Sequence, residues 1–311
     1  MSALPEGFSL RPATIGGLDA VAEVLAAEDL EATGEVFYDT GFVRFQWTKP
    51  GVDLPNDAWV VEDSDGRAIA HALVTPDGDE VVASWGVVRP SHRGRGIGSV
   101  LLDRIERRGG ERLAGGGRLQ HSVSDTDRAG ASMVSARGFR RVRTFRHMQI
   151  ELDGTVPPAE PPPGIEIRSI EPDRDLRTVH AIFLETFRDQ FGYRVIPFEV
   201  WLQIDVEDPS FDPSLWLLAT EGSEPVAALS AANWGDRGWI GELGVRHAWR
   251  GRGIGSSLLR RSFAAFAERG RPRVMLNVDS ENPTGAVGVY ERVGMRAVRG
   301  WDVYEKTLPE A

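Results

Sequence analysis

The sequence predicts a mixed α/β protein that contains two copies of one domain. Two observations predict this class: a segment that recurs about half a chain later, and strand-like and helix-like segments that alternate in the same order in each half. A third observation, a proline-rich segment between the halves, marks where one copy ends and the next begins. Because helices connect successive strands, each domain is expected to have a partly parallel, mixed central sheet flanked by helices.

The recurring segment reads RPSHRGRGIGSVLL from Arg89 and RHAWRGRGIGSSLL from Arg246. The two copies differ at four of 14 positions and lie 157 residues apart. A weaker similarity relates residues 136–152 to residues 292–308 at an offset of 156 residues. Solenoid repeats have periods of about 20–50 residues, so this long period indicates that a whole domain was duplicated.

The duplication divides the chain into residues 1–152, a linker at residues 153–164, and residues 165–311. The linker reads DGTVPPAEPPPG. Proline lacks the amide proton that a β-ladder needs, and it favours the extended polyproline conformation. We therefore expect this segment to be a semi-rigid spacer on the surface.

The two halves share one predicted order of elements. In the second half, apolar residues at strand spacing or between turn signals predict strands at 165–170, 215–220, 226–232, 239–245, 273–278 and 298–308. Apolar residues at helical spacing predict helices at 173–187, 253–268 and 284–292, the last of them after Pro283. The central strand, helix and strand of the first half are predicted at 81–88, 96–108 and 119–123.

The composition excludes several classes of protein. The 311 residues carry a formal net charge of −10 at pH 7, which argues against general binding to nucleic acid or to an anionic membrane. No cysteine is present, so disulfides, zinc–thiolate sites, iron–sulfur clusters and cysteine nucleophiles are excluded. The six histidines lack metal-ligand spacing, so no metal is expected. No apolar run could span a bilayer and no secretory signal is recognisable, so the expected location is the cytoplasm.

The repeated segment contains a glycine-rich loop between a predicted strand and a predicted helix. Glycine lets the backbone approach a ligand closely, and the amide groups at a helix N-terminus attract anions such as pyrophosphate. Neither copy has the lysine of a P-loop or the glycine spacing of a dinucleotide-binding fingerprint. In the second half the loop comprises Arg250, Gly251, Arg252, Gly253, Ile254, Gly255 and Ser256, and in the first half Arg93, Gly94, Arg95, Gly96, Ile97, Gly98 and Ser99.

The pattern Arg250-x-x-Gly253-x-Gly255, preceded by Leu243 and Val245, resembles motif A of the GNAT N-acetyltransferases. Residues 277–295, NVDSENPTGAVGVYERVGM, resemble motif B of the same family. The resemblance covers nearly the whole chain, and the chain is similar to the tandem GNAT proteins of actinomycetes. It implies two tandem GNAT domains and acetyl-CoA as co-substrate. The pyrophosphate would lie on the loop, and the pantetheine arm would lie beside Leu243 and Val245.

The first half repeats motif A after Val88, and the resemblance therefore implies a possible second CoA site there. The two halves differ at the positions that the family uses for chemistry. In this family a backbone amide near Leu243 would polarise the thioester carbonyl, and a motif B tyrosine, here Tyr290, would protonate the leaving thiolate. Asn282 resembles the residue that contacts the CoA arm. Glu242, just before the loop, is the candidate base, with a solvated or cap-bonding carboxylate as the alternative.

At the positions of Glu242, Asn282 and Tyr290 the first half has Trp85, Thr126 and Val134. We therefore expect chemistry in the second half, and a degenerate first half with a structural or CoA-binding role. In this family the acceptor pocket is shaped by the early helices and their loop. Aromatic and acidic residues there would suit an amino-bearing acceptor, with packing between the domains as the alternative. They are Phe191, Tyr193 and Trp201 together with Asp189, Asp205 and Glu207.

The expected function is the transfer of an acetyl group from acetyl-CoA to a primary amine of a small molecule. Direct attack in a ternary complex is expected, because no cysteine is present to carry the acyl group. An acyl-CoA sensor without turnover is one alternative, and an acetyltransferase for protein N-termini or lysines is another. The sequence leaves open which amine is acetylated, which acyl chain is preferred, and whether the protein is a monomer or a homodimer.

Overall fold

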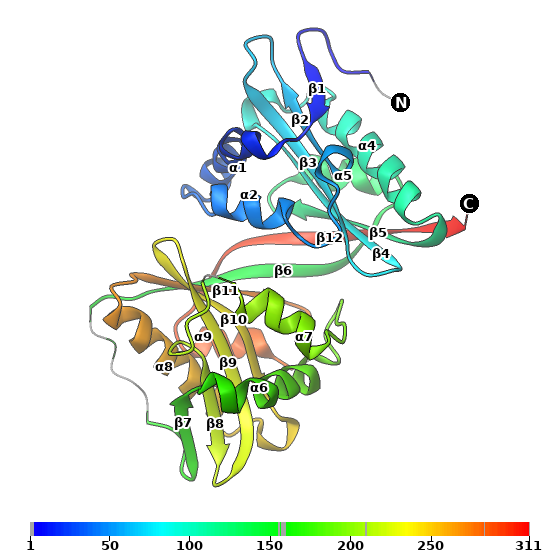
Figure 1. Ribbon diagram of the computed structural model, residues 1–311. Coiled ribbons are helices and arrows are strands. Elements are labelled where there is room, and N and C mark those ends of the chain that lie inside the picture. Colours follow the sequence, from blue (N-terminus) through cyan, green and yellow to red (C-terminus); the bar gives the residue numbers. More distant parts are fainter. Residues whose placement is uncertain (1–2, 155, 157–159, 209, 283, 311) are drawn as a thin grey trace. The chain divides into compact units, whose positions relative to one another are not determined.

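The computed structural model describes residues 3–154, 156, 160–208, 210–282 and 284–310. Contacts divide these residues into two compact units (Figure 1). Unit 1 comprises the described residues of Met1–Thr144 and of Arg299–Ala311, and unit 2 comprises those of Phe145–Val298. Pro283 and residues 155 and 157–159 of the proline-rich segment lie outside the described residues, so the expected helix start and spacer conformation are not described there.

Unit 1 is built on a mixed sheet. Its strands are β1 (Ser9–Pro12), β2 (Ala58–Glu62), β3 (Ala68–Pro76), β4 (Val81–Val88), β5 (Gly115–Ser124) and β12 (Arg296–Glu310), in that spatial order. Its helices are α1 (Leu18–Thr33), α2 (Thr40–Trp47), α3 (Leu54–Asp57), α4 (Ile97–Arg112) and α5 (Arg128–Ala136). The β4–β5 pair is parallel and its neighbours are antiparallel. Figure 1 shows α1 and α2 on one face of this sheet and α4 and α5 on the other.

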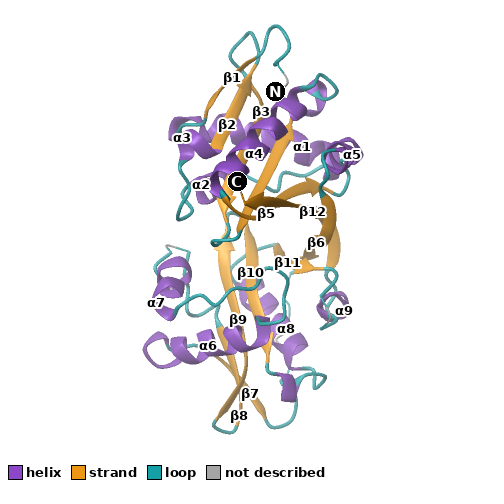
Figure 2. Cartoon of the chain, turned by 90° about the vertical axis from the view of Figure 1, so that its right-hand side faces the viewer, coloured by secondary structure: helices purple, strands orange, loops and turns teal. Residues whose placement is uncertain are grey.

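Unit 2 repeats this plan. Its sheet has the spatial order β6 (Arg140–Glu151), β11 (Arg273–Asp279), β10 (Arg237–Val245), β9 (Glu224–Trp234), β8 (Leu217–Glu221) and β7 (Ile165–Ser169). Its helices are α6 (Pro172–Phe187), α7 (Phe198–Trp201), α8 (Ile254–Glu268) and α9 (Ala286–Arg292), with a π-helical turn at Leu202–Val206. Figure 2 shows α6 and α7 on one face of the sheet and α8 and α9 on the other.

The predicted mixed α/β class is confirmed, and β4 coincides with the strand predicted at 81–88. Element ends differ by a few residues elsewhere. The hairpin of β8 and β9 is longer than predicted because its ladder continues to the pair Glu221 and Glu224, next to the turn. Helix α4 extends to Arg112 because its last turn packs against the core through Gly109, which a larger residue could not replace without moving Leu119.

Packing divides the chain differently from the sequence repeat. Strand β6 pairs with β11 of unit 2 over residues 145–151, and β12 pairs with β5 of unit 1 from Trp301 onward. Their side chains follow the same exchange, since Met148 belongs to the core of unit 2 and Tyr304 to the core of unit 1. Each repeat thus supplies the last strand of the other's sheet, so the ranges 1–152 and 165–311 are not the units that pack. Equivalent strands can be exchanged because either copy offers the same ladder hydrogen bonds.

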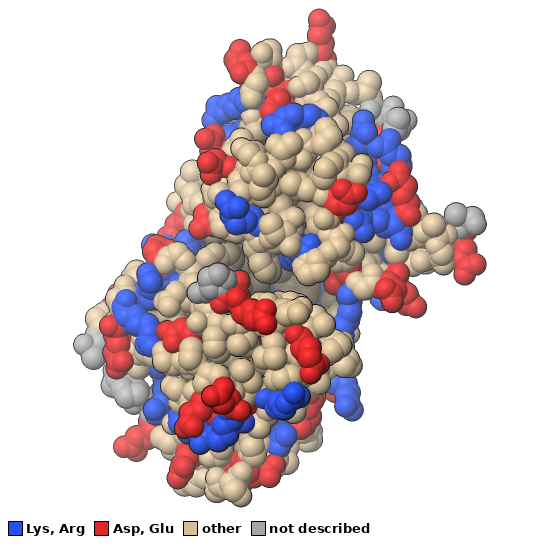
Figure 3. Space-filling view, in the orientation of Figure 1, with Lys and Arg blue, Asp and Glu red and all other residues tan. Residues whose placement is uncertain are grey.

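Charged side chains of both signs are scattered over the face in Figure 3, where basic residues lie among acidic and uncharged ones. This face therefore presents no extended basic region of the kind that binds nucleic acid. Among the described residues, no helix combines the length and the apolar character needed to cross a membrane.

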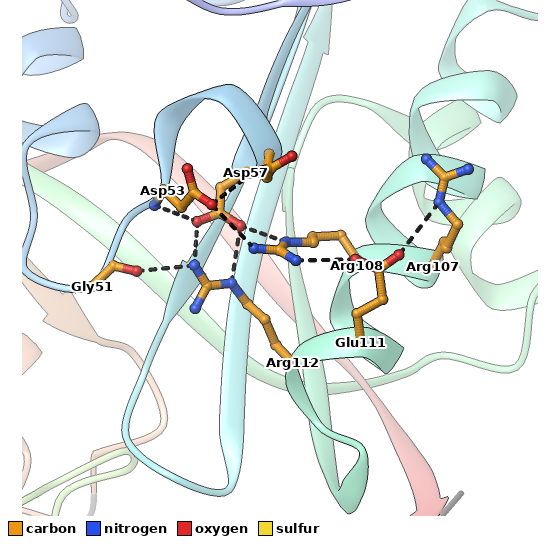
Figure 4. A network of polar contacts seen from close by, with 8 residues as sticks. Gly51, Asp53, Asp57, Arg107, Arg108, Glu111 and Arg112 are labelled. Carbon is orange, nitrogen blue, oxygen red and sulfur yellow. Dashed lines mark hydrogen bonds and ion pairs between the residues drawn. The ribbon is translucent and has the colours of Figure 1, made fainter.

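A buried aspartate ties α3 to α4 in unit 1 (Figure 4). Asp57 is 0 % exposed, and its carboxylate accepts hydrogen bonds from Arg108 Nε (2.8 Å), Arg112 Nε (2.9 Å) and the amide of Asp53 (2.7 Å). Burial raises the pKa of Asp57, but the hydrogen bonds from Arg112, Arg108 and the Asp53 backbone outweigh it and hold that pKa below its usual value. The carboxylate therefore stays charged and anchors the end of the helix that begins at the glycine-rich loop.

Replacing Asp57 with alanine should destabilise unit 1. Removing one partner of a buried ion pair costs about 3–5 kcal/mol, and we expect the lower end, about 3 kcal/mol, because both arginines can turn toward water. Urea unfolding followed by circular dichroism measures this loss. Asp53→Ala is the control: that side chain is 50 % exposed and 3.9 Å from Arg108, so its removal should cost less than about 1 kcal/mol. Equal losses in the two variants would contradict this account.

Candidate functional site

In unit 2 the parallel ladder between β10 and β11 stops partway along both strands. Its last pair is Ile240 with Leu276. Beyond that pair, β10 continues to Val245 beside β9, while β11 continues to Asp279 beside β6. Within the described residues the two strands therefore diverge, and backbone groups of residues 243–245 that face away from β9 have no ladder partner. An extended ligand can pair with such groups as an added strand would.

A β-bulge lies where the strands diverge. The register of β10 with β9 shifts between Ile240 and Leu243, which inserts one extra residue at Gly241 and Glu242. The Glu242 amide donates to the Ser230 hydroxyl at 2.9 Å. A Cβ at Gly241 would lie 2.9 Å from this hydroxyl, so glycine makes the close approach possible. Bulges commonly re-aim a side chain next to a functional site, and this one presents the half-buried Glu242 at the divergence.

Two carboxylates near the bulge have raised pKa values. Burial, and secondly the negative charge of Asp205, raise the pKa of Glu242 to about 8. Burial and the charge of Asp208 raise the pKa of Asp205 to about 6. Glu242 is therefore mainly protonated at neutral pH and becomes a base as the pH rises through about 8. Strongly shifted carboxylates beside a backbone opening are typical of sites that move protons.

The glycine-rich loop of unit 2 follows β10 directly. Gly251 and Gly253 have φ of +77° and +83°, which residues with a Cβ rarely adopt. Helix α8 then begins at Ile254 without a side-chain cap, so the amides of its first turn, including Ser256, are available to an anion. A Cβ at Gly255 would lie 3.7 Å from Val245 and 3.9 Å from Val289. The first turn of α8 therefore packs closely against the end of β10 and against α9.

The two arginines of this loop are in different electrostatic states. Arg252 pairs with Glu221 at 2.5 Å, and Trp249 donates to the same carboxylate at 2.8 Å. Arg250 donates from Nε to the Val245 carbonyl at 3.0 Å and has no ion pair among the described residues. Arg250 is therefore the loop guanidinium that keeps an uncompensated charge, as a phosphate ligand requires.

Tyr290 and Asn282 occupy the motif B segment. Tyr290 lies on α9 and is 9 % exposed, and burial raises its pKa to about 12. Its phenol therefore stays protonated and can act as a proton donor. Asn282 lies before α9, where its Oδ1 accepts hydrogen bonds from the Thr284 amide (2.9 Å) and hydroxyl (2.7 Å). The Asn282 side chain thus has a local structural role at this turn.

The aromatic residues predicted near the acceptor have structural contacts. Trp201 is 3 % exposed and packs against Trp216 with ring centroids 5.6 Å apart. Tyr193 donates from its hydroxyl to the Leu184 carbonyl at 2.9 Å. Phe191 lies in the loop after α6, with its ring centroid 6.5 Å from that of Phe145. Trp201 is therefore a core residue, whereas Phe191 and Tyr193 lie in the loop between α6 and α7.

In unit 1 the equivalent strands do not diverge at this point. The β4–β5 ladder runs without interruption to the pair Trp85 and Ser122, two pairs beyond the position at which the unit 2 ladder stops. The register of β4 with β3 shows no shift. Trp85, at the position of Glu242, packs against His71 and Phe42 with centroid separations of 5.0 and 6.2 Å. The unit 1 strands thus diverge two pairs later than those of unit 2, beyond Trp85, and an aromatic cluster occupies the position that Glu242 has in unit 2.

The loop of unit 1 keeps its backbone form. Gly94 and Gly96 have φ of +75° and +82°, and α4 begins at Ile97 without a side-chain cap. Its first arginine, Arg93, forms an ion pair with Glu31, unlike Arg250. The remaining predicted residues contact their own unit: Arg95 donates to Ser91 O at 3.3 Å, Ser99 donates to Met133 Sδ at 3.6 Å, and Gly98 lies between Met133 and Val88. Val134, at the position of Tyr290, is fully buried.

The bulge and the divergence of β10 from β11 were not predicted from the sequence, although a signal was present. Gly241 and Gly244 lie inside the predicted strand 239–245, and glycine inside a strand often marks a bulge. A Cβ at Gly244 would lie 2.3 Å from the Thr186 hydroxyl of α6, so this glycine also permits close packing of that helix. The described residues contain no cluster of three or more potential metal-ligating side chains.

Comparison with known proteins identifies the fold. The model of the acetyltransferase (GNAT) family matches residues 20–139 and again residues 176–295. A mycothiol acetyltransferase of Thermobispora bispora is 33 % identical over 253 residues, which cover 74 % of this chain and 81 % of that protein. A mycothiol acetyltransferase of Streptomyces bingchenggensis is 30 % identical over 300 residues, covering 94 % and 90 %.

Solved structures agree with these matches. A GCN5-related N-acetyltransferase from Sphaerobacter thermophilus superposes with a TM-score of 0.85 at 32 % identity, covering 98 % of this chain and 97 % of that one. A tandem GNAT protein from the clavulanic acid biosynthesis pathway has the same fold, with a TM-score of 0.68 at 18 % identity over 96 % of this chain and 98 % of that chain. The chain belongs to the acetyltransferase (GNAT) family and is an N-acetyltransferase with two GNAT domains in tandem.

Proposed function

We propose that unit 2 transfers an acetyl group from acetyl-CoA, the donor of GNAT acetyltransferases, to a primary amine of a small molecule. The observation that carries this proposal is the divergence of β10 from β11, which leaves the backbone between Glu242 and the glycine-rich loop without a ladder partner on that edge. Several relatives are named mycothiol acetyltransferase, which supports a small-molecule acceptor. The amine acted on by this chain is not identified by that likeness.

The donor would be held at two places. Its pyrophosphate would lie on the α8 N-terminus, where Gly253 and Gly255 keep the amides accessible and Arg250 adds an unpaired positive charge. Its pantetheine arm would pair with the backbone at Leu243 and Val245, as an added strand does. A backbone amide near Leu243 would then polarise the thioester carbonyl. Asn282, besides forming its turn, would contact the CoA arm.

Proton transfer would use Glu242 and Tyr290, whose pKa values are both raised by burial. Glu242, once ionised, would take a proton from the amine, and the neutral amine would attack the thioester carbonyl directly. Tyr290, which burial keeps protonated, would give its proton to the thiolate as the carbon–sulfur bond breaks. Trp85 and Val134 cannot perform these steps, so unit 1 is proposed to support the structure and to have no acetyl-transfer chemistry.

Activity should rise with pH through the titration of Glu242. O-Benzylhydroxylamine is a suitable acceptor for this measurement because its amine stays uncharged at every pH of the profile, from neutral pH upward. We expect kcat/KM to increase with a midpoint near pH 8, since an uncharged acceptor releases a proton as its nitrogen attacks, and Glu242 can take that proton only when it is ionised. Glu242→Gln should lose this limb and about 10²–10⁴-fold in rate. An unchanged pH profile in the variant would exclude Glu242 as the base.

Tyr290→Phe should lower kcat about 10²-fold, because a positioned acid contributes at least this factor when a thiolate departs. Release of CoA measured with a thiol reagent gives this rate. Tyr304→Phe is the matched control, since Tyr304 is a similarly buried tyrosine, 8 % exposed, in the core of unit 1. The control should stay within about twofold of the wild type. Full activity of Tyr290→Phe would remove Tyr290 from the mechanism.

The two loop arginines should differ in their effect on the donor. Arg250→Ala should raise the KM for acetyl-CoA about tenfold or more, because hydrogen bonds to charged groups contribute about 1.5–3 kcal/mol. Arg93→Ala, the same change in unit 1, should leave that KM within about twofold, since Arg93 is already paired with Glu31. Equal effects would indicate that the loop of unit 1 takes part in turnover.

A further inference from the structure

A π-helical turn presents Asp205 in unit 2. The turn spans Leu202–Val206 directly after α7, and the Glu207 amide donates to the Leu202 carbonyl at 2.9 Å, five residues back. Single π turns have poorer geometry than an α-helix and occur often at functional sites. Such a turn changes the direction of the side chains that it carries, and Asp205 is one of them.

The side of the helix on which Asp205 lies follows from its neighbours. Trp201, one turn earlier, is 3 % exposed and packs into the core of unit 2. Val200 and Ile204, each one position before Trp201 and Asp205, are 42 % exposed, so the side of the helix that these two share faces outward. Residues one turn apart share a face, so Asp205 lies on the inward face with Trp201. It is half-buried, as Glu242 is, and its charge acts on Glu242.

Neither carboxylate is compensated by the protein. Among the described residues, Asp205 and the Glu242 side chain have no hydrogen-bond or ion-pair partner, and the contact made by Glu242 is through its backbone amide. Charged groups on the adjoining elements are engaged elsewhere: Glu185 and Glu224 with Arg246, Arg237 with Asp236, Asp279 with the Glu281 amide, and Asp208 with the Ser210 amide. Two partly buried carboxylates without a cation are unfavourable.

We propose that Asp205 binds the ammonium form of the acceptor and positions it to give a proton to Glu242, which makes Asp205 the residue that selects protonated primary amines. This inference rests on the proposed function of unit 2. It is carried by the inward face of the π turn, the bulge that presents Glu242, and the absence of a protein cation for either carboxylate among the described residues.

The protons balance in this scheme. The ammonium group gives one proton to the Glu242 carboxylate, and its nitrogen then forms the new bond to the thioester carbon. As the carbon–sulfur bond breaks, the thiolate takes the Tyr290 proton, and the nitrogen returns its second proton to the Tyr290 phenolate. The products are an amide, the free thiol of CoA and protonated Glu242, which releases its proton to water. Asp205 stays ionised throughout.

The test compares two acceptors of nearly the same shape. Benzylamine is an ammonium ion at neutral pH, and O-benzylhydroxylamine is uncharged. Asp205→Asn should raise the KM for benzylamine about tenfold or more, and change the KM for O-benzylhydroxylamine less than about twofold. The KM for acetyl-CoA should not change. Glu199→Gln, which removes a 75 % exposed carboxylate from α7, should leave all three values unchanged.

A second readout separates this role from a structural one. Removing the Asp205 charge should move the midpoint of the pH profile for O-benzylhydroxylamine below its wild-type position near pH 8, because Glu242 then ionises more easily. Asp205→Glu should restore the midpoint and most of the benzylamine affinity. Thermal melts of each variant check its folding.

The outcomes distinguish the two proposals. If Asp205→Asn folds and keeps both the benzylamine KM and the pH midpoint of the wild type, the role of Asp205 is overturned. If the wild type releases no CoA with either acceptor, the proposed function fails. Calorimetric titration with benzylamine then decides the inference alone: binding that Asp205→Asn weakens about tenfold supports it, and binding that the variant keeps overturns it.

Discussion

The two units differ in where their one pair of parallel strands stops pairing. Backbone groups that leave a ladder need other partners, since an unpaired buried group is costly. In unit 2 the bulge at Gly241 and Glu242 ends the β10–β11 ladder, while β6 satisfies the other edge of β11 from Arg273 to Asp279. The edge of β10 is thereby left for a ligand. In unit 1 the ladder runs two pairs further, to Trp85, and β4 lacks a partner on this edge only beyond that residue.

The two units also differ in which of their charged side chains form ion pairs. In unit 1, Arg93 pairs with Glu31, and the nearly buried Arg299 pairs with Glu28 and Asp29. Unit 2 leaves Arg250, Glu242 and Asp205 without an ion pair among the described residues and close to the diverging strands. Unpaired charges of this kind reduce stability, so they are expected where a ligand supplies the missing partner. Backbone and electrostatics thus favour the same unit as the proposed site of chemistry.

Local patterns allowed the fold class, the duplication and both glycine-rich loops to be predicted from the sequence. Features that depend on which segments pair could not be predicted in the same way. Hydrophobic periodicity does not reveal the exchange of β6 and β12, because the two strands are equivalent in the repeats and have similar sequence patterns. The bulge needs the register of β10 against Ser230, and the inward face of Asp205 needs the π turn. Trp201 was predicted to line the acceptor pocket because it is aromatic, but it is a core residue.

The strand exchange gives unit 1 a structural role that does not depend on binding CoA. Residues 145–151 of β6, which continue directly from unit 1, pair with the whole of β11 in unit 2. Without them both edges of β11 would be unpaired beyond Leu276, and the strand could then close onto β10 or onto another chain. The divergence that the proposed reaction requires is therefore supported by a strand that the first repeat supplies. A first repeat with no proposed role in acetyl transfer can be retained for this reason, whether or not its loop still binds CoA.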